Sequence, residues 1–293
     1  MKRKKVTIVG GDQRQATVAS VLAKKDFDVH VYGIKKDVLP DGVIFCPDWR
    51  AAIKNSDCLV LPLPISPDGK RVNAPMLEGN APLLCDILSD MPSGALVLGG
   101  KIGQKQKRLI EAYGLRVVDY FESDALQEAN ALPTAEGAVQ ILMREIPRVI
   151  FGMSVAVTGF GRVARALVKL LVAMGACVTV FARKEADRLA AKALGAKAFS
   201  LESKEFCEMG GHYTAVLNTV PAVIFTPRIL EEIDRKTLLI DLASAPGGFD
   251  PAVSTMGFRT VYALSLPGKY APVTAGELIA NVLLEAMKEE GLL

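Results

Sequence analysis

The chain has 293 residues; half of them are hydrophobic, 23% are charged, and the formal net charge is +3. This length predicts two domains, and the composition is ordinary for a globular protein in water. A small net charge, few aromatic residues and no basic stripe argue against a nucleic-acid-binding protein. Apolar runs are too short to cross a membrane, and the run behind the basic N-terminus is too short for a signal peptide, so we expect a cytoplasmic protein.

Cysteine and histidine usage indicates neither disulfides nor a metal. The five cysteines are scattered without CxxC spacing, which predicts reduced thiols. No spacing of histidine, cysteine or carboxylate residues matches a metal site, so none is expected. The two histidines, His30 and His212, lie in a strand pattern and in a glycine-rich loop. Structural roles are expected for both.

Strand-like and helix-like segments alternate from end to end, which predicts an α/β fold of two Rossmann-like, doubly wound parallel-sheet domains. The first domain is expected over residues 1–131, on the substrate side. Its expected strands are Lys5–Val9, Asp28–Tyr32, Cys58–Leu61, Ala95–Leu98 and Leu115–Asp119, and its expected helices include Arg14–Lys25 and Gln104–Tyr113.

The second domain, over residues 132–273, is expected to bind the cofactor. A linker helix opens it, with Pro133 at its start, Thr134 as a cap and Glu136 in its first turn. The strands expected after this helix are Ser154–Thr158, Cys177–Phe181, Ala215–Asn218, Thr237–Asp241 and Arg259–Tyr262, with helices at Arg162–Met174 and Lys184–Leu194.

The last helix is expected to start near Thr274, where Thr274 and Glu277 form a capping-box pattern, and to run to about Glu290. In two-domain α/β dehydrogenases such a helix often returns to the first domain, so residues 274–293 are expected to pack there. An interdomain cleft is then expected to hold the reaction, because open parallel sheets bind ligands beyond the carboxyl ends of their strands.

The most informative motif is Gly159-Phe160-Gly161-Arg162-Val163-Ala164, between an apolar strand and a helical run. In this context it predicts a dinucleotide pyrophosphate site. The first glycine permits a tight turn, the second lets the backbone approach phosphate, and the small last residue lets the helix pack on the strand. The helix N-terminus adds N–H groups and a positive dipole end. The alternative is an ordinary strand–helix turn.

The second strand of this domain is followed by Arg183 and Lys184, where an NAD site usually places an acid for the ribose 2′-hydroxyl. A cation there favours a 2′-phosphate, so NADP(H) is the preferred cofactor, and NAD stays possible. Both side chains can also be solvated surface charges.

Two later strands of the second domain run into Asn218-Thr219-Val220-Pro221 and Asp241-Leu242-Ala243-Ser244. In a doubly wound sheet both strand ends face the cofactor. Asn and Thr can therefore reach the nicotinamide ribose, and a Pro-rich turn can line one side of the nicotinamide ring. Turn formation alone also accounts for these residue types, and the two interpretations are compatible. The expected cofactor contacts here are Asn218, Thr219, Val220, Pro221, Asp241, Ala243 and Ser244.

Two cations of the first domain follow glycine-rich strand ends, Arg14 after Gly10-Gly11-Asp12 and Lys101 after Gly99-Gly100. Both can bind carboxylates, arginine as a fork and lysine as a point charge. Equally open is that Arg14 pairs only with Asp12 and that Lys101 is solvated. Lys269 and Tyr270, in an expected loop before the last helix, are further candidate substrate contacts, although a tight turn explains that loop equally well.

Together these segments resemble one family, the A subunit of bacterial dipicolinate synthase from endospore formers. Pro-Thr-Ala-Glu-Gly and Asp-Leu-Ala-Ser-x-Pro-Gly-Gly are its most specific motifs here. The matching stretches cover nearly the whole chain in order: Ile8–Gln15, Pro133–Gly137, Val157–Val163, Asn218–Pro221, Ile240–Gly248 and Leu266–Ala275. More loosely, the layout is similar to alanine dehydrogenase and the 2-hydroxyacid dehydrogenases.

The resemblance implies a reaction in which dihydrodipicolinate, from the lysine pathway, loses hydride to NADP⁺ and a proton to a base, giving pyridine-2,6-dicarboxylate. Aromatisation supplies much of the driving force, so orientation is the protein's main task. Two carboxylates need two cationic clamps, for which Arg14 and Lys101 are the candidates. Thr134 and Tyr270 are further expected substrate contacts.

The base stays open between Asp12, Glu136, Lys269 and water. The family also implies a flavodoxin-like partner, the B subunit, and the mother-cell cytoplasm of a sporulating bacterium as location, and a homo-oligomer is expected. Two other interpretations remain. One is another NADP dehydrogenase, of the shikimate or methylenetetrahydrofolate kind, although no counterpart of the shikimate enzymes' Lys–Asp pair is seen. The other is a non-catalytic NADP-binding regulatory subunit.

Overall fold

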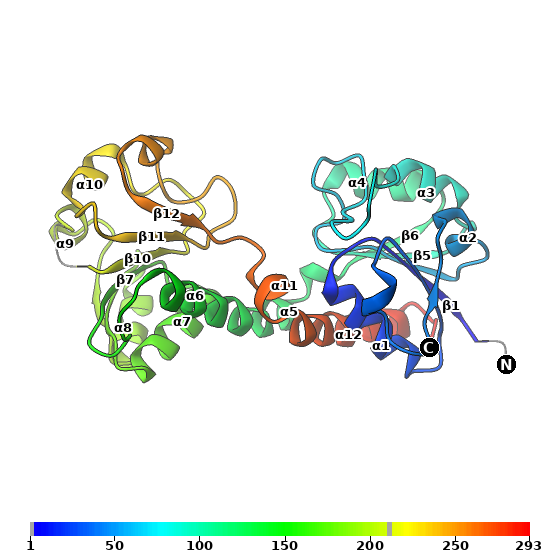
Figure 1. Cartoon of the computed structure of the whole chain (residues 1–293), viewed down its shortest axis with the longest axis horizontal. Helices are drawn as coiled ribbons and strands as arrows, with labels where there is room; N and C mark the ends of the chain where they lie inside the picture. The colour runs from blue at the N-terminus through cyan, green and yellow to red at the C-terminus, as the bar shows by residue number, and fades with distance from the viewer. Residues whose placement is uncertain (1–2, 210–212) are drawn as a thin grey trace. The chain divides into compact units, whose positions relative to one another are not determined.

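The computed structural model describes residues 3–209 and 213–293, so His212 lies outside the described residues. The chain forms two compact units. Unit 1 contains Met1–Asn130 together with Ala271–Leu293, and unit 2 contains Ala131–Tyr270. Figure 1 labels most of the helices and strands of both units.

Unit 1 is built on a six-stranded parallel sheet with the strand order β3-β2-β1-β4-β5-β6. Its strands are β1 (Lys5–Val9), β2 (Asp28–Tyr32), β3 (Ile44–Phe45), β4 (Cys58–Val60), β5 (Leu96–Gly99) and β6 (Arg116–Asp119). Strand side chains alternate between the faces, so β1 buries Val6 and Ile8 in one apolar cluster and Val9 in another. Because both faces are covered, the inner strands β4 and β5 are apolar throughout.

Helices cover both faces of this sheet. α1 and α12 pack in the cluster that contains Val6, and α2, α3 and α4 pack in the cluster that contains Val9. The helical segments of unit 1 are α1 (Gln13–Ala23), η1 (Lys36–Val38), α2 (Trp49–Ile53), α3 (Leu84–Asp90), α4 (Gln104–Ala112), η2 (Tyr120–Glu122), α5 (Asp124–Ala129) and α12 (Pro272–Glu289).

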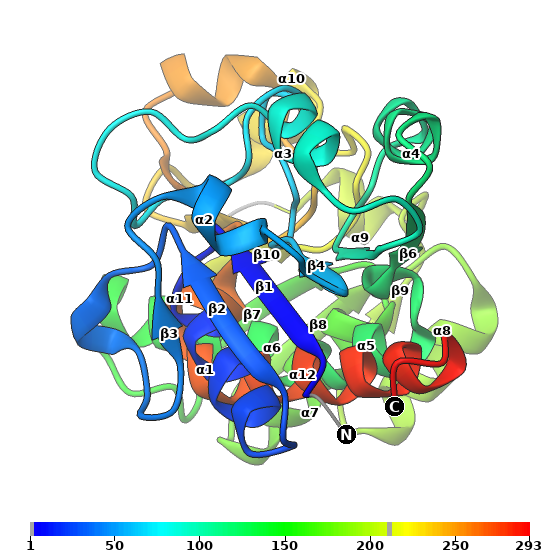
Figure 2. The same ribbon diagram turned by 90° about the vertical axis from the view of Figure 1, so that its right-hand side faces the viewer.

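The last helix, α12, packs directly on the first, α1, as Figure 2 shows beneath strands β1 and β2. Gly276 permits this close approach, because a Cβ atom there would lie 2.6 Å from the Arg14 carbonyl oxygen and 2.5 Å from Thr17 Cβ. The side chains of Ile279, Leu283 and Met287 are buried in the same cluster. Unit 1 is therefore made from both ends of the chain.

Unit 2 is a second six-stranded parallel sheet, with the order β12-β11-β10-β7-β8-β9. Its strands are β7 (Ser154–Thr158), β8 (Cys177–Phe181), β9 (Lys197–Phe199), β10 (Ala215–Asn218), β11 (Leu238–Asp241) and β12 (Arg259–Tyr262). Its helical segments are α6 (Ala131–Glu145), α7 (Arg162–Ala173), α8 (Glu185–Ala193), α9 (Lys204–Cys207), α10 (Pro227–Glu232), η3 (Pro251–Thr255) and α11 (Leu266–Tyr270). Two parallel sheets with flanking helices are the predicted fold class, which is confirmed.

Three local predictions are wrong. Helix α6 starts at Ala131, so Pro133 and Thr134 lie inside its first turn and Thr134 is not its cap; proline is tolerated there because first-turn N–H groups have no helical partner. The expected loop before the last helix is instead α11. Helix α12 starts at Pro272, with Ala271 as N-cap, so Thr274 and Glu277 do not form its capping box.

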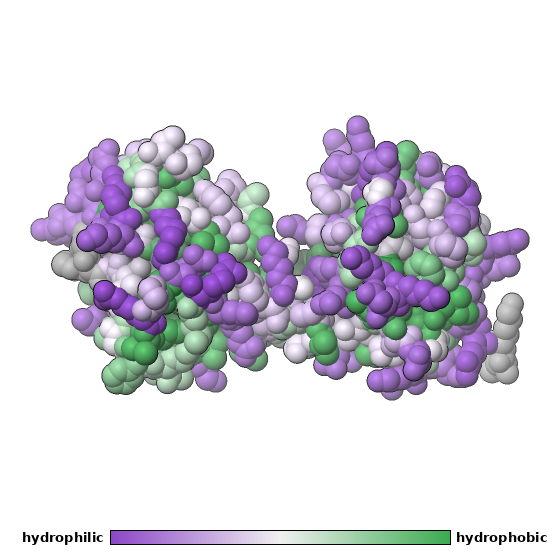
Figure 3. All heavy atoms as spheres, in the orientation of Figure 1, coloured by the Kyte–Doolittle hydropathy of each residue, from purple (hydrophilic) through white to green (hydrophobic). Residues whose placement is uncertain are grey.

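No helix among the described residues is long and apolar enough to cross a lipid bilayer. In the space-filling view of Figure 3, hydrophilic side chains cover much of the visible surface of each unit. The five cysteines are all free thiols.

Candidate cofactor and substrate sites

The turn between β7 and α7 in unit 2 has the geometry that the glycine motif predicts. Gly159 has a φ of +84°, and its N–H donates to the Phe181 carbonyl at 2.8 Å, which joins the turn to the neighbouring strand β8. A Cβ atom at this position would lie 2.5 Å from Thr219 Oγ1. Both the conformation and the space therefore require glycine here.

Gly161, the N-cap of α7, borders open space. A Cβ atom there would meet no protein atom within 4 Å, and no side chain caps the helix. The first turn of α7 contains no acidic residue. Phe160 is buried in the core, while Arg162 and Val163 are partly exposed in that first turn. Backbone N–H groups and room for an anion fit a dinucleotide pyrophosphate.

The corresponding turn of unit 1 is closed to a phosphate group. Gly11 N–H donates to the Asn73 carbonyl at 2.7 Å, and a Cβ atom at Gly10 would lie 2.7 Å from the same oxygen. At the helix N-terminus, the Asp12 carboxylate accepts from Arg14 N–H at 3.0 Å, and Gln15 completes a capping box. A carboxylate and a carbonyl thus take the donors that an anion would need.

The segment after β8 carries the predicted cations. Arg183 and Lys184 are exposed, and Ala182 before them is buried. Arg188, from the first turns of α8, donates from Nη1 to the carbonyls of Ala182 at 3.0 Å and Arg183 at 2.6 Å. Arg188 therefore braces the backbone that carries Arg183, a role that no sequence motif indicates.

Asn218 and Asp241 form a buried network at the ends of β10 and β11. Asn218 Oδ1 accepts from Thr158 Oγ1 at 2.7 Å, and its Nδ2 donates to Asp241 Oδ1 at 2.8 Å. Asp241 also accepts N–H bonds from Ala243 at 3.1 Å and Gly248 at 2.9 Å. Asn218 is fully buried and Asp241 is only 2% exposed. Both side chains hold the turns together, which is the turn-forming role expected for them. Their expected contact with a cofactor stays a prediction.

The other predicted cofactor contacts of these turns lie nearer the surface. Thr219 and Val220 are half-buried, and Thr219 Oγ1 donates to the Thr158 carbonyl at 2.7 Å. Pro221 and Ser244 are exposed, while Ala243 is buried. The contact between Thr219 and the Gly159 position brings the β10 turn onto the glycine turn.

Arg14 is held rigidly by its own turn. Its Nε and Nη2 donate to the two carboxylate oxygens of Asp12, both at 2.9 Å, and Nη2 also donates to the Leu63 carbonyl at 3.0 Å. The side chain of Arg14 is only 8% exposed. Its Nη1 forms no hydrogen bond among the described residues. Both carboxylate oxygens of Asp12 are engaged in this pair, which orients Arg14, and the candidate role of Asp12 as a base stays a prediction.

Lys101 sits in a strained turn at the end of β5. Its φ is +57°, uncommon for a residue with a side chain. The Asp119 carboxylate holds this turn by accepting N–H bonds from Lys101 at 2.9 Å and Ile102 at 2.6 Å. The Lys101 ammonium forms no ion pair among the described residues. It borders a cavity of about 490 Å³, which Ser66, Gln106 and Gln127 also line.

Arg14 and Lys101 flank one loop of unit 1. Arg14 bonds the Leu63 carbonyl, and Ile65 N–H donates to the Gly100 carbonyl at 3.1 Å. Strand β4, which this loop follows, lies between β1 and β5. The two cations therefore follow the ends of two strands that lie about 10 Å apart. Buried Tyr120 supports the loop by donating to the Leu61 carbonyl at 3.1 Å, and burial raises the pKa of its phenol.

The predicted residues of α6 and α11 lie in unit 2. Glu136 and Lys269 are exposed, and Thr134 is half-buried. Tyr270 packs against Gly137, where a Cβ atom would lie 3.0 Å from its ring, and its hydroxyl accepts from Arg144 Nη1 at 3.2 Å. This gives Tyr270 a packing role between α11 and α6.

Asp119 is the residue that the sequence reasoning missed most clearly, although its place at the end of a predicted strand was a signal. Within residues 3–209 and 213–293, no group of three or more histidine, cysteine or acidic side chains is arranged to hold a metal ion. His30, in β2, is paired with Asp28, its Nε2 lying 3.2 Å from Asp28 Oδ1.

Comparisons by family model, by sequence and by structure all find the A subunit of dipicolinate synthase. Residues 5–121 match the family model of the N-terminal domain of the dipicolinate synthase A subunit. The chain is 28% identical over 287 residues to the A subunit of dipicolinate synthase from Bacillus subtilis (strain 168), covering 97% of this chain and 96% of that protein. A crystal structure of this subunit from B. subtilis matches with a TM-score of 0.84 and 28% identity, over 100% of this chain and 98% of that one.

Two further solved structures extend this finding. The A subunit of dipicolinate synthase from Bacillus halodurans matches with a TM-score of 0.86 and 27% identity, over 97% of each chain. An L-alanine dehydrogenase, 14% identical, matches with a TM-score of 0.69 over 98% of this chain and 91% of that chain, and it shares the fold. By its sequence and its structure, the chain is similar over nearly its whole length to the A subunits of dipicolinate synthase.

Proposed function

We propose that the protein is an NADP-dependent oxidoreductase that oxidises dihydrodipicolinate to dipicolinate. The observation that carries the proposal is the open N-terminus of α7 at Gly161, in a chain similar to these A subunits. A helix N-terminus with no side-chain cap, a glycine approach and no acidic residue in its first turn suits the pyrophosphate of a dinucleotide. Arg183 and Lys184 supply the cations that a 2′-phosphate needs.

The substrate side of the proposal rests on unit 1. Pyridine-2,6-dicarboxylate and its dihydro precursor each carry two carboxylates on one six-membered ring. We assign one carboxylate to Arg14, whose guanidinium is oriented by Asp12, and the other to Lys101, whose turn is pinned by Asp119. The Asp12 pair occupies Nε and Nη2 of Arg14 and fixes the guanidinium, so Nη1 is the preoriented donor of a charge-assisted hydrogen bond to the substrate carboxylate.

In this reaction the dihydropyridine ring gives up a hydride and a proton and becomes aromatic. The nicotinamide ring, when bound, is the hydride acceptor. The protein's own residues hold the ring by its carboxylates, so that one face is presented and rotation is prevented. Asp12, which is half-buried, and Glu136 and Lys269, which are exposed, remain the candidates to receive the proton, with water as the alternative.

The similarity to dipicolinate synthase A subunits also supports a partner. Proteins named as an A subunit imply a second subunit, and we propose the flavodoxin-like B subunit for this role, along with self-association of the chain. The site of action proposed for the complex is the cytoplasm of the sporulating mother cell.

The test mixes the purified protein, with and without the B subunit, with freshly made dihydrodipicolinate and NADP⁺ or NAD⁺. Absorbance follows both dipicolinate and reduced nicotinamide, which are expected to appear in equal amounts and faster with NADP⁺. If neither product forms under any combination, while NADPH still binds, the chain is a nucleotide-binding regulatory subunit instead.

The cofactor assignment is tested by Arg183→Asp. Replacing the cation by an acid should shift the ratio of kcat/KM for NADP⁺ over NAD⁺ toward NAD⁺ by about tenfold or more, because a charged hydrogen bond is lost and a ribose acceptor is gained. Arg228→Asp, on the exposed surface of α10, is the matched control. An unchanged ratio in Arg183→Asp would refute the NADP assignment.

A further inference from the structure

Unit 1 contains a second cavity, of about 320 Å³, whose lining includes neither Arg14 nor Lys101. It lies beyond the carboxyl ends of β2 and β3. Three segments line it: residues 32–37 after β2, residues 45–47 after β3, and residues 76–78 from the loop before α3. This volume is within the range of small-molecule sites, at its lower end.

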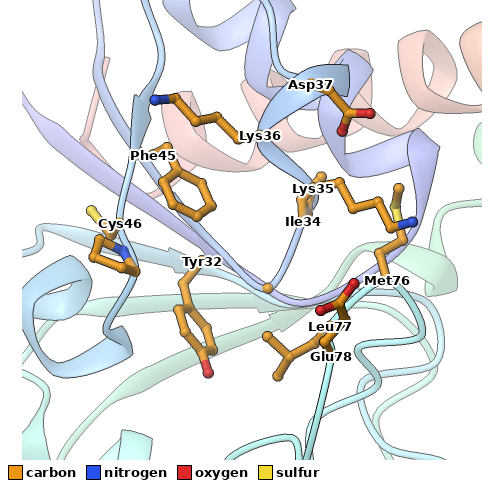
Figure 4. A pocket seen from close by; sticks show the side chains of 12 residues that line it. Tyr32, Ile34, Lys35, Lys36, Asp37, Phe45, Cys46, Met76, Leu77 and Glu78 are labelled. Carbon is orange, nitrogen blue, oxygen red and sulfur yellow. The ribbon is translucent and has the colours of Figure 1, made fainter.

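The walls of this cavity are aromatic on one side and aliphatic on the other. Figure 4 shows the rings of Phe45 and Tyr32 on one side, with Leu77 and Glu78 across from them. Ile34 and Met76 complete the apolar lining. Phe45 is 37% exposed, a large apolar surface to leave in water. A flat ring placed against Phe45 and Tyr32 would cover this surface.

Charged side chains surround the apolar lining of this cavity without forming ion pairs with one another. Lys35, Lys36, Asp37 and Glu78 all line the cavity. Among the described residues none of the four forms a salt bridge. The cavity therefore offers ammonium groups to an anion and carboxylates to hydroxyl donors, on either side of a stacking surface.

The position of the cavity in the fold points to a nucleoside. In unit 1 the run β1–turn–α1–β2 repeats the layout of β7–turn–α7–β8 in unit 2, and the space beyond the second strand is where such a fold holds the nucleoside of a dinucleotide. The pyrophosphate position of unit 1 is filled by Asp12 and by the Asn73 carbonyl. Only the nucleoside end is open, so a ligand here cannot extend a diphosphate over the turn.

We propose that this cavity binds a nucleoside monophosphate. The base stacks on Phe45 and Tyr32 against Leu77, Glu78 accepts hydrogen bonds from the sugar hydroxyls, and the flexible ammonium groups of Lys35 and Lys36 take the phosphate. A tyrosine phenol is a neutral hydrogen-bond donor at physiological pH, and burial raises the pKa of Tyr32 further. The site is separate from the proposed dehydrogenase chemistry and does not depend on it.

The probe is adenosine 5′-monophosphate, titrated calorimetrically into the full-length protein with and without excess NADP⁺, which occupies unit 2. We expect one site that is retained when NADP⁺ is present. The Lys35→Glu/Lys36→Glu double variant should weaken it by about tenfold or more, because the phosphate loses its charged partners. Phe45→Ala should weaken it too, through lost stacking. Lys105→Glu/Lys107→Glu, on exposed positions of α4, and Arg183→Asp should leave it unchanged.

Three results would overturn the assignment. The first is no binding of the probe once NADP⁺ is present. The second is a loss of binding in Arg183→Asp with full binding in the Lys35/Lys36 variant, which would put the probe on unit 2. The third is dipicolinate binding as tightly as the nucleotide and losing affinity in Phe45→Ala, which would make the site one for aromatic carboxylates. Circular dichroism of each variant verifies folding, and both lysines are exposed.

Discussion

At Gly161 and Gly248, one added methyl group has opposite consequences. At Gly248 a Cβ atom would clash with Asn218 Nδ2, inside the buried network that joins β10 to β11. At Gly161 it would meet no protein atom within 4 Å. Gly248→Ala should therefore destabilise the fold by about 2–4 kcal/mol, through the broken network. Gly161→Ala should cost less than about 1 kcal/mol.

NADPH binding should be affected more by Gly161→Ala than by Gly248→Ala, the reverse of their order in stability. Gly161→Ala projects a methyl group into the space proposed for the pyrophosphate, so it should weaken NADPH binding strongly. Thermal unfolding and NADPH titration of both variants provide the measurement. If Gly161→Ala binds NADPH like the wild type, the pyrophosphate does not lie at the α7 N-terminus.

A second prediction for a single residue concerns Asp68 and the stability of the fold at low pH. Its Oδ1 accepts N–H bonds from Arg71 and Lys70, both at 2.8 Å, and the Ser66 hydroxyl at 3.0 Å. The backbone N–H groups of Arg71 and Lys70 lower the pKa of Asp68 from 3.8 to about 2. A carboxyl group whose pKa is lower in the folded state than in the unfolded state stabilises the fold at pH values above its unfolded-state pKa. This contribution is lost as the pH falls through the folded-state pKa.

The wild type should therefore lose stability between about pH 4 and pH 2 in part through Asp68, and Asp68→Asn should make this loss smaller. The melting temperature measured across this range verifies the difference. Asp41→Asn, on an exposed loop of the same unit, is the matched control. Parallel acid profiles for the wild type and Asp68→Asn would contradict the prediction.

At the scale of the element, the contact of α12 with α1 depends on one residue. A Cβ atom at Gly276 would lie 2.6 Å from the Arg14 carbonyl oxygen, which is backbone and cannot rotate away. Gly276→Ala should push the helices apart and destabilise the fold by about 1–3 kcal/mol, as overpacking does. Thr274→Ala, exposed on the same helix and not its cap, should change stability by less than about 0.5 kcal/mol.

Urea or thermal unfolding of the two variants is the measurement. Equal stability of Gly276→Ala and the wild type would mean that the helix contact relaxes without cost. A large loss in Thr274→Ala would restore the capping role that its spacing to Glu277 predicts.

The elements that could be predicted from the sequence are those whose signal is local. Strands β1, β2, β7, β8, β10 and β12 have the bounds that their apolar patterns predict. Strands β3 and β9, of two and three residues at the sheet edges, carry too few apolar residues to produce a pattern. Helices α6 and α12 begin earlier than their capping patterns predict, because both contain a proline in the first turn.

At the scale of the whole molecule, the rest of the site depends on contacts between distant segments. The glycine turn of unit 1 looks like a phosphate turn in sequence, and Asn73, far along the chain, closes it. Asn218 and Asp241 look like ligand contacts, and their mutual bond across neighbouring strands buries them. Arg188 and Asp119 act through carbonyls and N–H groups that no motif reveals. Local patterns predicted the places of the sites, and tertiary contacts decided which side chains are available there.

The division of unit 1 between the two ends of the chain has a consequence for biosynthesis. Residues 131–270 form unit 2 without interruption, so that unit is complete once they leave the ribosome. Unit 1 waits for α12, whose Ile279, Leu283 and Met287 fill its apolar cluster. At about 5–20 residues per second, the apolar face of α1 stays uncovered while all of unit 2 is made. The apolar face of α1 is therefore open to chaperones until α12 has been made.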